Sequence, residues 1–186
     1  PLYFLAPWLS QFIGGTPELS LRAPSLFAGL LLPLAGWWCA RQAGAGRNTA
    51  LIAALLIALD PRSIFYAQEA RGYALVQLLA LLHLGLLLAQ LREGRAGRLR
   101  VAWITTGVLL FYLHYTTALA LVAESLALAI CVCVPRTGGE PPRDVRGWFG
   151  DLFVMAGACL PELPTVLAVA RRRDNWSHML TPDTFW

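Results

Sequence analysis

The chain has few charged residues. Asp, Glu, Lys and Arg together make up 14% of its 186 residues, whereas a soluble domain typically carries about 25%. Hydrophobic residues make up 57%, and the mean hydropathy is +0.56. Because so few charges cannot cover a water-facing surface, the composition excludes an ordinary soluble protein and predicts an integral membrane protein.

A basic face and a metal-binding cysteine pattern are also absent. There is no lysine, and the fifteen arginines are spread along the chain instead of being interleaved with aromatic residues on one face, so we expect no nucleic-acid partner. The four cysteines lie in or beside apolar stretches, without CxxC spacing and without neighbouring histidines. We interpret them as small core or lipid-facing side chains. They are Cys39, Cys131, Cys133 and Cys159.

The chain does contain long apolar stretches between its charged residues. A helix needs roughly 20 apolar residues to cross about 30 Å of hydrocarbon. We predict six spans. Three are single stretches of about this length: Ala23–Ala40, Gly72–Leu91 and Trp148–Ala170. Val101–Pro135 is long enough for two spans, and Asn48–Leu59 continued by Ile64–Ala67 makes one broken span.

Local sequence features mark the turns and breaks between these spans. The polar segment His114–Thr117 is the natural turn between the paired spans, and Pro161 and Pro164 are expected to kink the last one. Leu2–Ile13 is too short to cross and is predicted to be an interfacial helix. The predicted fold is an all-α polytopic helix bundle, a single module over residues 1–186 with about six transmembrane helices plus the N-terminal interfacial helix.

The arginines predict the orientation of this bundle. Nine of them fall on one side: Arg41, Arg47, Arg92, Arg95, Arg98, Arg100, Arg136, Arg143 and Arg146. Arg22, Arg62 and Arg71 fall on the other side, with the triplet Arg171–Arg173 counting against the assignment. The positive-inside rule makes the nine-arginine side cytoplasmic. The segments Asp60–Arg71 and His114–Thr117 then face the outside of a cell (inner) membrane.

The densest polar cluster is Asp60–Tyr73, between two predicted spans. Charges at the hydrocarbon edge cost several kcal/mol unless they are paired, hydrated or used. If Tyr66–Tyr73 begins the next helix, Glu69 and Tyr73 share one face. One interpretation is a hydrated loop in which Glu69 pairs with Arg62 or Arg71. The other is a site for an anionic headgroup, in which both arginines neutralise phosphate and Glu69 holds a metal, a sugar hydroxyl or an acceptor.

Three segments resemble a known family. Tyr66–Tyr73, which reads YAQEARGY, resembles the Tyr-Ser-Gln-Glu-Ala-Arg-x-Tyr signature of bacterial GT-C glycosyltransferases. These polytopic enzymes are related to protein O-mannosyltransferases and to the lipid A aminoarabinose transferase. Leu19–Gly29 resembles the family's Leu-Arg-x-Pro-Ser-x-x-x-Gly segment, and Pro1–Leu5 resembles the end of its His-Pro-Pro-Leu-Tyr element. His114 and Tyr115 fall where relatives carry an aromatic pair, so the ordered features extend over nearly the whole chain.

The resemblance implies an enzyme that transfers a sugar from a polyprenyl-phosphate carrier, with inversion, on the extracytoplasmic face. The acceptor is a lipid, a glycan or a protein, and membrane lipids surround the enzyme. The family's general base is an acid upstream of the His-Pro-Pro element, so it is expected upstream of Pro1. The chain is therefore expected to be a fragment without the catalytic loop and without any C-terminal extracytoplasmic domain, inactive alone.

The resemblance also gives provisional roles to residues of this chain. Glu69 matches the family's second acidic position, near the donor phosphate or a divalent metal such as Mg or Mn, and Arg71 and Arg62 are phosphate contacts. Gln68, Tyr66 and Tyr73 bind the sugar or shape the pocket, although tyrosines also collect at headgroup depth as anchors. His114 donates to phosphate or is a satisfied interfacial residue.

Three further features keep alternatives open. Glu124 lies inside a predicted span, where an acid is a functional hypothesis, but pairing with His83 or a hydroxyl is the favoured interpretation. Glu162 lines the site, or lies at the end of the last span without a role in it. Arg171–Arg173 contact anionic lipid or are simply solvated. The alternative function is a polytopic transporter or lipid flippase in which Glu124, His83 and Glu162 form a polar path.

Overall fold

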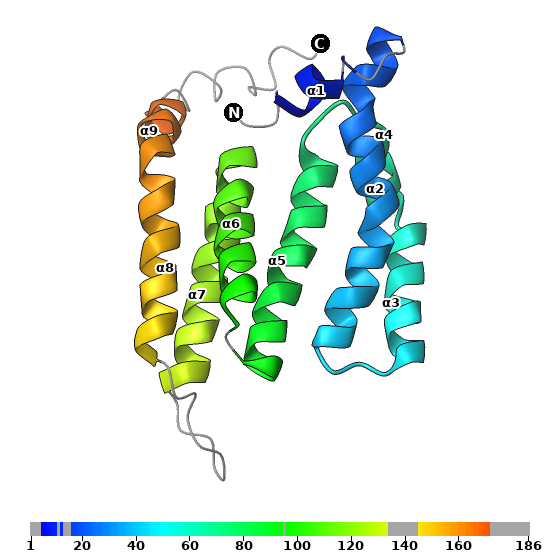
Figure 1. Ribbon diagram of the computed structural model, residues 1–186. Coiled ribbons are helices and arrows are strands. Elements are labelled where there is room, and N and C mark those ends of the chain that lie inside the picture. Colours follow the sequence, from blue (N-terminus) through cyan, green and yellow to red (C-terminus); the bar gives the residue numbers. More distant parts are fainter. Residues whose placement is uncertain (1–4, 11, 13–15, 95, 134–144, 172–186) are drawn as a thin grey trace, which may run out of the picture.

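The computed structural model describes residues 5–10, 12, 16–94, 96–133 and 145–171, and within these ranges the chain is helical, with no strand (Figure 1). The predicted all-α class is therefore confirmed. The elements are α1 Leu5–Ser10, α2 Pro17–Gln42, α3 Arg47–Leu59, α4 Pro61–Gln68, α5 Tyr73–Glu93, α6 Gly97–Leu113, α7 Thr117–Cys133, α8 Val145–Cys159, a 3₁₀ turn Leu160–Glu162, and α9 Leu163–Arg171.

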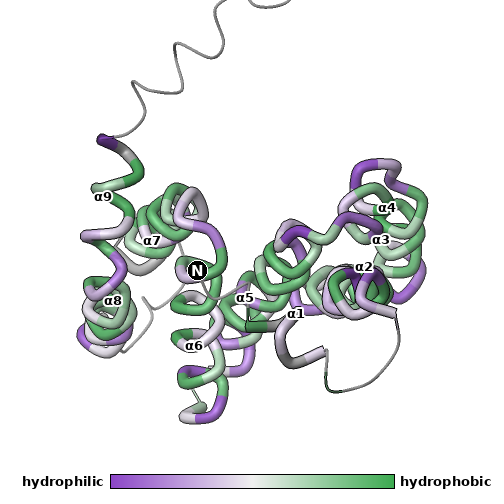
Figure 2. The backbone as a smooth tube through the Cα atoms, turned by 90° about the horizontal axis from the view of Figure 1, so that it is seen from above, coloured by the Kyte–Doolittle hydropathy of each residue, from purple (hydrophilic) through white to green (hydrophobic). Residues whose placement is uncertain are grey.

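The long helices run alternately up and down, with α5 in the middle of the molecule. Seen from above, α2, α3 and α4 gather on one side of α5, and α6, α7 and α8 gather on the other (Figure 2). One apolar core joins α2 to α5 around Ala28, Leu32 and Leu78. A second core joins α5, α6, α7 and α8 around Trp103 and Met155.

Among the described residues, three helical segments are long and apolar enough to cross a membrane: Pro17–Gln42, Tyr73–Glu93 and Arg146–Val169. The pair α3 and α4, bent by 55°, makes a fourth if it is one broken span. The two remaining predicted spans coincide with α6 and α7, which are helices of 17 residues each, below that length. Length and composition therefore support three or four of the six predicted spans.

Small residues are common at the buried contact of α2 with α5, and large apolar residues also face outward. Buried positions on α2 and α5 include Ser25, Ala35 and Ala74, whereas Leu30 is 75% exposed and Phe153 on α8 is 80% exposed. At Gly85 a Cβ would overlap the Trp38 ring, so α5 and α2 approach closely there. Small residues that allow close helix contact, with leucine and phenylalanine facing outward, are the arrangement expected in lipid.

The predicted break at Asp60–Pro61 is confirmed. The Asp60 carboxylate accepts hydrogen bonds from the Ser63 backbone N–H and hydroxyl, both at 2.8 Å. Pro61 occupies the first position of α4, where a missing N–H costs nothing. Asp60 thus ends α3 and caps α4, which turns the chain toward the loop that carries the signature.

The other two predicted irregularities are present as well. The turn between α6 and α7 comprises residues 114–116, and a 3₁₀ turn at Leu160–Glu162 contains Pro161. Both lie at the same end of the bundle as the loop between α4 and α5 (Figure 1). We call this the signature end. Local sequence chemistry therefore brings three separate segments to one end of the molecule.

Candidate functional site

The signature segment Tyr66–Tyr73 does not form one helix. A shared face for Glu69 and Tyr73 required this segment to begin the next helix, but α4 ends at Gln68 and α5 begins at Tyr73. Glu69 is extended, with φ −80° and ψ 142°, so the chain reverses direction there. The condition is not met, and Glu69 and Tyr73 do not share a helical face. The charged residues of the signature lie in a four-residue loop, residues 69–72.

This loop is attached to the second family-like segment, at the beginning of α2. The hydroxyl of Ser25 donates to the backbone oxygen of Arg71 at 2.8 Å. One turn further along α2, a Cβ at Gly29 would overlap the Cβ of Ala67 on α4. The Ser and Gly of the Leu-Arg-x-Pro-Ser-x-x-x-Gly segment thus contact Arg71 and Ala67 of the signature, although the two segments are far apart in sequence.

The charges of the loop are only loosely paired. The Nε of Arg71 lies 3.8 Å from a carboxylate oxygen of Glu69, beyond hydrogen-bonding distance. The Arg71 side chain is 67% exposed and that of Glu69 27%. One predicted hydrated-loop pairing, that of Glu69 with Arg71, is therefore present, but it leaves the guanidinium able to bind an anion.

Arg62 and Gln68 are exposed on α4. Arg62 lies in the first turn of α4, about 9 Å from the last residue of that helix at 1.5 Å per residue. In the part of the chain that the structure describes, no hydrogen bond or ion pair connects the Arg62 side chain with Glu69 or Arg71. The structure thus brings Arg71 and Glu69 together, and leaves Arg62 apart from them.

A row of aromatic rings leads from the signature to the turn between α6 and α7. The rings of Tyr66 and Tyr73 are 5.1 Å apart, those of Tyr73 and His114 5.7 Å, and those of His114 and Tyr115 5.5 Å. The Nδ1 of His114 lies 2.6 Å from the hydroxyl of Thr116, which fixes the orientation of the imidazole. Tyr66, Tyr73 and His114 are therefore brought into one continuous cluster.

A cavity of about 200 Å³ lies beyond His114; most of its lining is apolar, and we call it the polar cavity because a histidine and a glutamate line it. His114 and Glu162 both line it, so the interpretation of Glu162 as a residue of the site agrees with its position. Glu162 is half-buried and, within residues 5–171 as far as they are described, has no hydrogen-bond or ion-pair partner. The rest of the lining is aromatic, aliphatic or hydroxylated: Phe111, Tyr112, Leu113, Tyr115, Thr165, Val166 and Val169.

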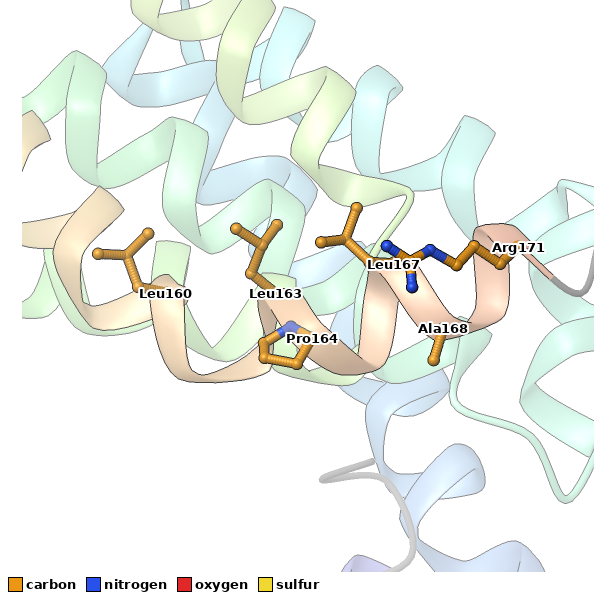
Figure 3. Close-up of a pocket in the computed structure, with 6 residues that line it drawn as sticks. All are labelled: Leu160, Leu163, Pro164, Leu167, Ala168 and Arg171. Atoms are coloured by element: carbon orange, nitrogen blue, oxygen red, sulfur yellow. The ribbon is translucent and has the colours of Figure 1, made fainter.

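Two apolar cavities adjoin the polar one. A cavity of about 270 Å³ between α6, α7 and α8 shares Phe111 with the polar cavity. A third, of about 370 Å³, shares Leu160 and Leu163 with the second. Figure 3 shows Leu160, Leu163 and Leu167 following one another along this third cavity, with Arg171 at its far end.

The predicted pairing of Glu124 is confirmed. One Glu124 carboxylate oxygen lies 3.1 Å from the Nε2 of His83, and the other accepts from the Trp103 indole N–H at 3.2 Å. The Nδ1 of His83 lies 3.1 Å from the Trp103 backbone oxygen and 3.0 Å from the Thr106 hydroxyl. His83 is 2% exposed and Glu124 16%. This buried cluster joins α5, α6 and α7.

Sequence reasoning missed an ion pair whose acid is buried and whose arginine is partly exposed. Arg100 binds Asp151 through two hydrogen bonds, of 2.9 and 2.6 Å, and so ties α6 to α8. The sequence does indicate such a pair, because Asp151 is an isolated acid in an apolar stretch and needs a partner there. Glu162 lies in the cavity beside His114, and no contact between described side chains connects it to Glu124 or His83. The polar path of the transporter hypothesis is therefore not seen among the described residues.

The described residues do not form a complete metal site. No three His, Cys, Asp or Glu side chains among them are grouped so that they could hold a metal ion. Glu69 alone provides too few ligands for Mg²⁺ or Mn²⁺, which take several oxygen ligands. Its metal-binding role stays a prediction, and we assign no chemical step to a metal.

Fold and site together define a helical protein with helices long and apolar enough to cross a membrane and a polar cluster at one end of its bundle. Comparison of the chain with protein-family models, curated proteins and solved structures found no match. The function is therefore inferred from the residues and their geometry.

Proposed function

We propose that the chain is the transmembrane module of a GT-C-like glycosyltransferase, which transfers a sugar from a polyprenyl-phosphate carrier to an acceptor. In this proposal α3–α4, α6 and α7 also cross the membrane, giving six passes, and α1 lies at the interface. The signature end faces the extracytoplasmic side of the cell (inner) membrane. The loop with Glu69 and Arg71 binds the donor phosphate.

The observation that carries the proposal is the contact between the two family-like segments. Ser25 and Gly29, one turn apart on α2, meet Arg71 and Ala67 of the signature. Two motifs that were recognised separately in the sequence thus form one structure. A chance match of short motifs gives no reason for their residues to meet.

The loop also has the chemistry that a lipid phosphate needs. When the sugar leaves its carrier, negative charge develops on the phosphate, and a cation already in place stabilises that charge. Arg71 provides a planar guanidinium suited to phosphate oxygens, with its backbone fixed by Ser25 and its side chain largely exposed. Tyr66, Tyr73 and His114 lie next to the loop, where they contact the sugar.

The proposed reaction is an inverting displacement. An acceptor oxygen bonds to the anomeric carbon of the sugar, the bond from that carbon to the phosphate oxygen breaks, and the phosphate leaves with the bonding pair. The acceptor proton goes to a carboxylate base, which the family resemblance places upstream of Pro1. We assign that role to no acid of this chain, and none of the described acids is needed for it.

Equilibrium binding of undecaprenyl phosphate to the intact gene product in nanodiscs tests the donor site. We expect Arg71→Ala to weaken binding about tenfold or more, because a hydrogen bond to a charged group contributes roughly 1.5–3 kcal/mol. Arg22→Ala is the control, since Arg22 lies at the same end and pairs with Glu18 at 2.9 Å. Equal affinities of Arg71→Ala, Arg22→Ala and wild type would remove the donor site from this loop.

A further inference from the structure

We propose that the polar cavity at His114 and Glu162, together with the apolar cavity that adjoins it at Phe111, binds an amphiphilic lipid with a hydroxylated headgroup. Its role as the acceptor rests on the proposed function, whereas the binding itself does not. The family resemblance allows a lipid, a glycan or a protein as the acceptor, and this proposal specifies a lipid.

The polar cavity suits a hydroxylated ring. Glu162 offers a half-buried carboxylate without a partner among the described residues, and a charged acceptor in such a place gains from binding hydroxyl groups. The Thr165 hydroxyl and the His114 imidazole add further hydrogen-bonding groups, while Tyr112 and Tyr115 provide apolar ring surfaces. The Tyr112 hydroxyl already donates to the Ala158 backbone oxygen at 3.1 Å, which fixes that wall.

The adjoining cavity suits a hydrocarbon chain. It is lined by apolar side chains of α6, α7 and α8, and its one hydroxyl, that of Ser125, donates to the Leu121 backbone oxygen of its own helix. No lining residue carries a charge. The two cavities share Phe111, so they are neighbours. A lipid with a polar headgroup and an apolar chain matches this pair of linings.

The position of His114 separates this site from the donor phosphate. The Tyr73 ring contacts His114 at 5.7 Å and belongs to the signature, whereas Glu162 and the apolar cavity belong to α6–α9. We assign the acceptor role to the lipid in this second site, so that the two substrates meet at Tyr73 and His114. The binding experiment below tests whether the donor chain occupies the apolar cavity instead.

Binding of three radiolabelled lipids to the intact protein in phosphatidylcholine nanodiscs tests the proposal. The probes are monoglucosyl diacylglycerol, diacylglycerol with the same acyl chains, and undecaprenyl phosphate. Glu162→Gln tests the headgroup site. Ala156→Trp fills the apolar cavity, and Val154→Trp is its control, because Val154 is an exposed residue of the same helix outside the linings of both cavities.

We expect Glu162→Gln to weaken binding of the glucosyl lipid about tenfold and to leave diacylglycerol and undecaprenyl phosphate unchanged. Ala156→Trp should weaken binding of both diacylglycerol lipids by a similar factor, whereas Val154→Trp should have no effect. Equal effects of the two tryptophans, or no effect of Glu162→Gln, would overturn the proposal. Loss of undecaprenyl phosphate binding in Ala156→Trp would also overturn the proposal, because the cavity would then hold the donor chain.

The same measurements separate this inference from the proposed function. If Arg71→Ala leaves undecaprenyl phosphate binding unchanged while Glu162→Gln and Ala156→Trp act as expected, the donor site fails and the amphiphile site stands. If only Arg71→Ala acts as expected, the donor site stands and the amphiphile site fails.

Discussion

At the scale of residues, Arg71 and Glu124 show two ways in which the chain places charge near hydrocarbon. The backbone of Arg71 is held by Ser25 while its guanidinium stays exposed, so the cation is held in place and can still bind a ligand. Glu124 is instead enclosed, with contacts to His83 and Trp103 on two other helices. A charge inside a bundle persists when partners satisfy it, which makes Glu124 structural and leaves Arg71 for a ligand.

Glu124→Ala should lower the stability of the bundle by about 1–3 kcal/mol, because His83 and the Trp103 N–H lose a buried partner. Thermal unfolding in detergent measures this. Ser125→Ala is the neighbouring control, since the Ser125 hydroxyl bonds only within its own helix, to the Leu121 oxygen. An unchanged melting temperature in Glu124→Ala would show that the cluster does not hold α5, α6 and α7 together.

At the scale of elements, the approach of α4 to α2 determines where the signature lies. Gly29 leaves no room for a Cβ against Ala67, and Asp60 and Pro61 turn α4 toward that contact. Together they place the end of α4, and therefore the loop with Glu69 and Arg71, beside Ser25. The glycine of this segment is thus required by packing, because its side-chain space is already filled.

Gly29→Ala should destabilise the protein by about 1–3 kcal/mol through overpacking against Ala67. It should also weaken binding of undecaprenyl phosphate, because the loop moves with α4. Gly157→Ala is a matched control inside α8, where an added Cβ meets nothing within 4 Å. There the better helix propensity of alanine should leave stability unchanged or slightly raised. Equal melting temperatures of the two variants would contradict this account of α2 and α4.

Where an element ends was predictable from the sequence only when the cause is local. Asp60–Pro61, His114–Thr117 and Pro161 each carry their own turn or cap chemistry, and all three were located correctly. The reversal at Glu69 was missed, because what fixes it is the contact of Arg71 with Ser25 on a distant helix. The cavity at Glu162 likewise depends on how α6 meets α9, which no local pattern encodes.

At the scale of the whole molecule, the bundle has two unlike ends. Among the described residues, six arginines lie at the end opposite the signature and four at the signature end. The six are Arg41, Arg47, Arg92, Arg98, Arg100 and Arg146, and the four are Arg22, Arg62, Arg71 and Arg171. The signature end carries Arg71, the aromatic row and the polar cavity. An arginine-rich end stays in the cytoplasm, so this asymmetry predicts that the candidate site faces outward.

Labelling of single cysteines with a membrane-impermeant maleimide in intact cells tests that orientation. The native cysteines are first replaced by alanine. Ala70→Cys, in the loop between α4 and α5, should then be labelled from outside, and Ala43→Cys, in the loop between α2 and α3, should not. Both alanines are exposed, so accessibility to the reagent is matched. The opposite labelling pattern would place the signature in the cytoplasm and contradict a donor site on the extracytoplasmic face.

The most direct measurement of the central claim is sugar transfer by the intact gene product. Radiolabelled polyprenyl-phosphate sugars are supplied with a glycolipid acceptor, and transfer by wild type is compared with that by Arg71→Ala and Arg22→Ala. The account predicts transfer by wild type and Arg22→Ala, and a loss of about 10²–10³-fold in Arg71→Ala, the usual effect of removing one group that stabilises developing charge. Transfer by Arg71→Ala at the wild-type rate would contradict it.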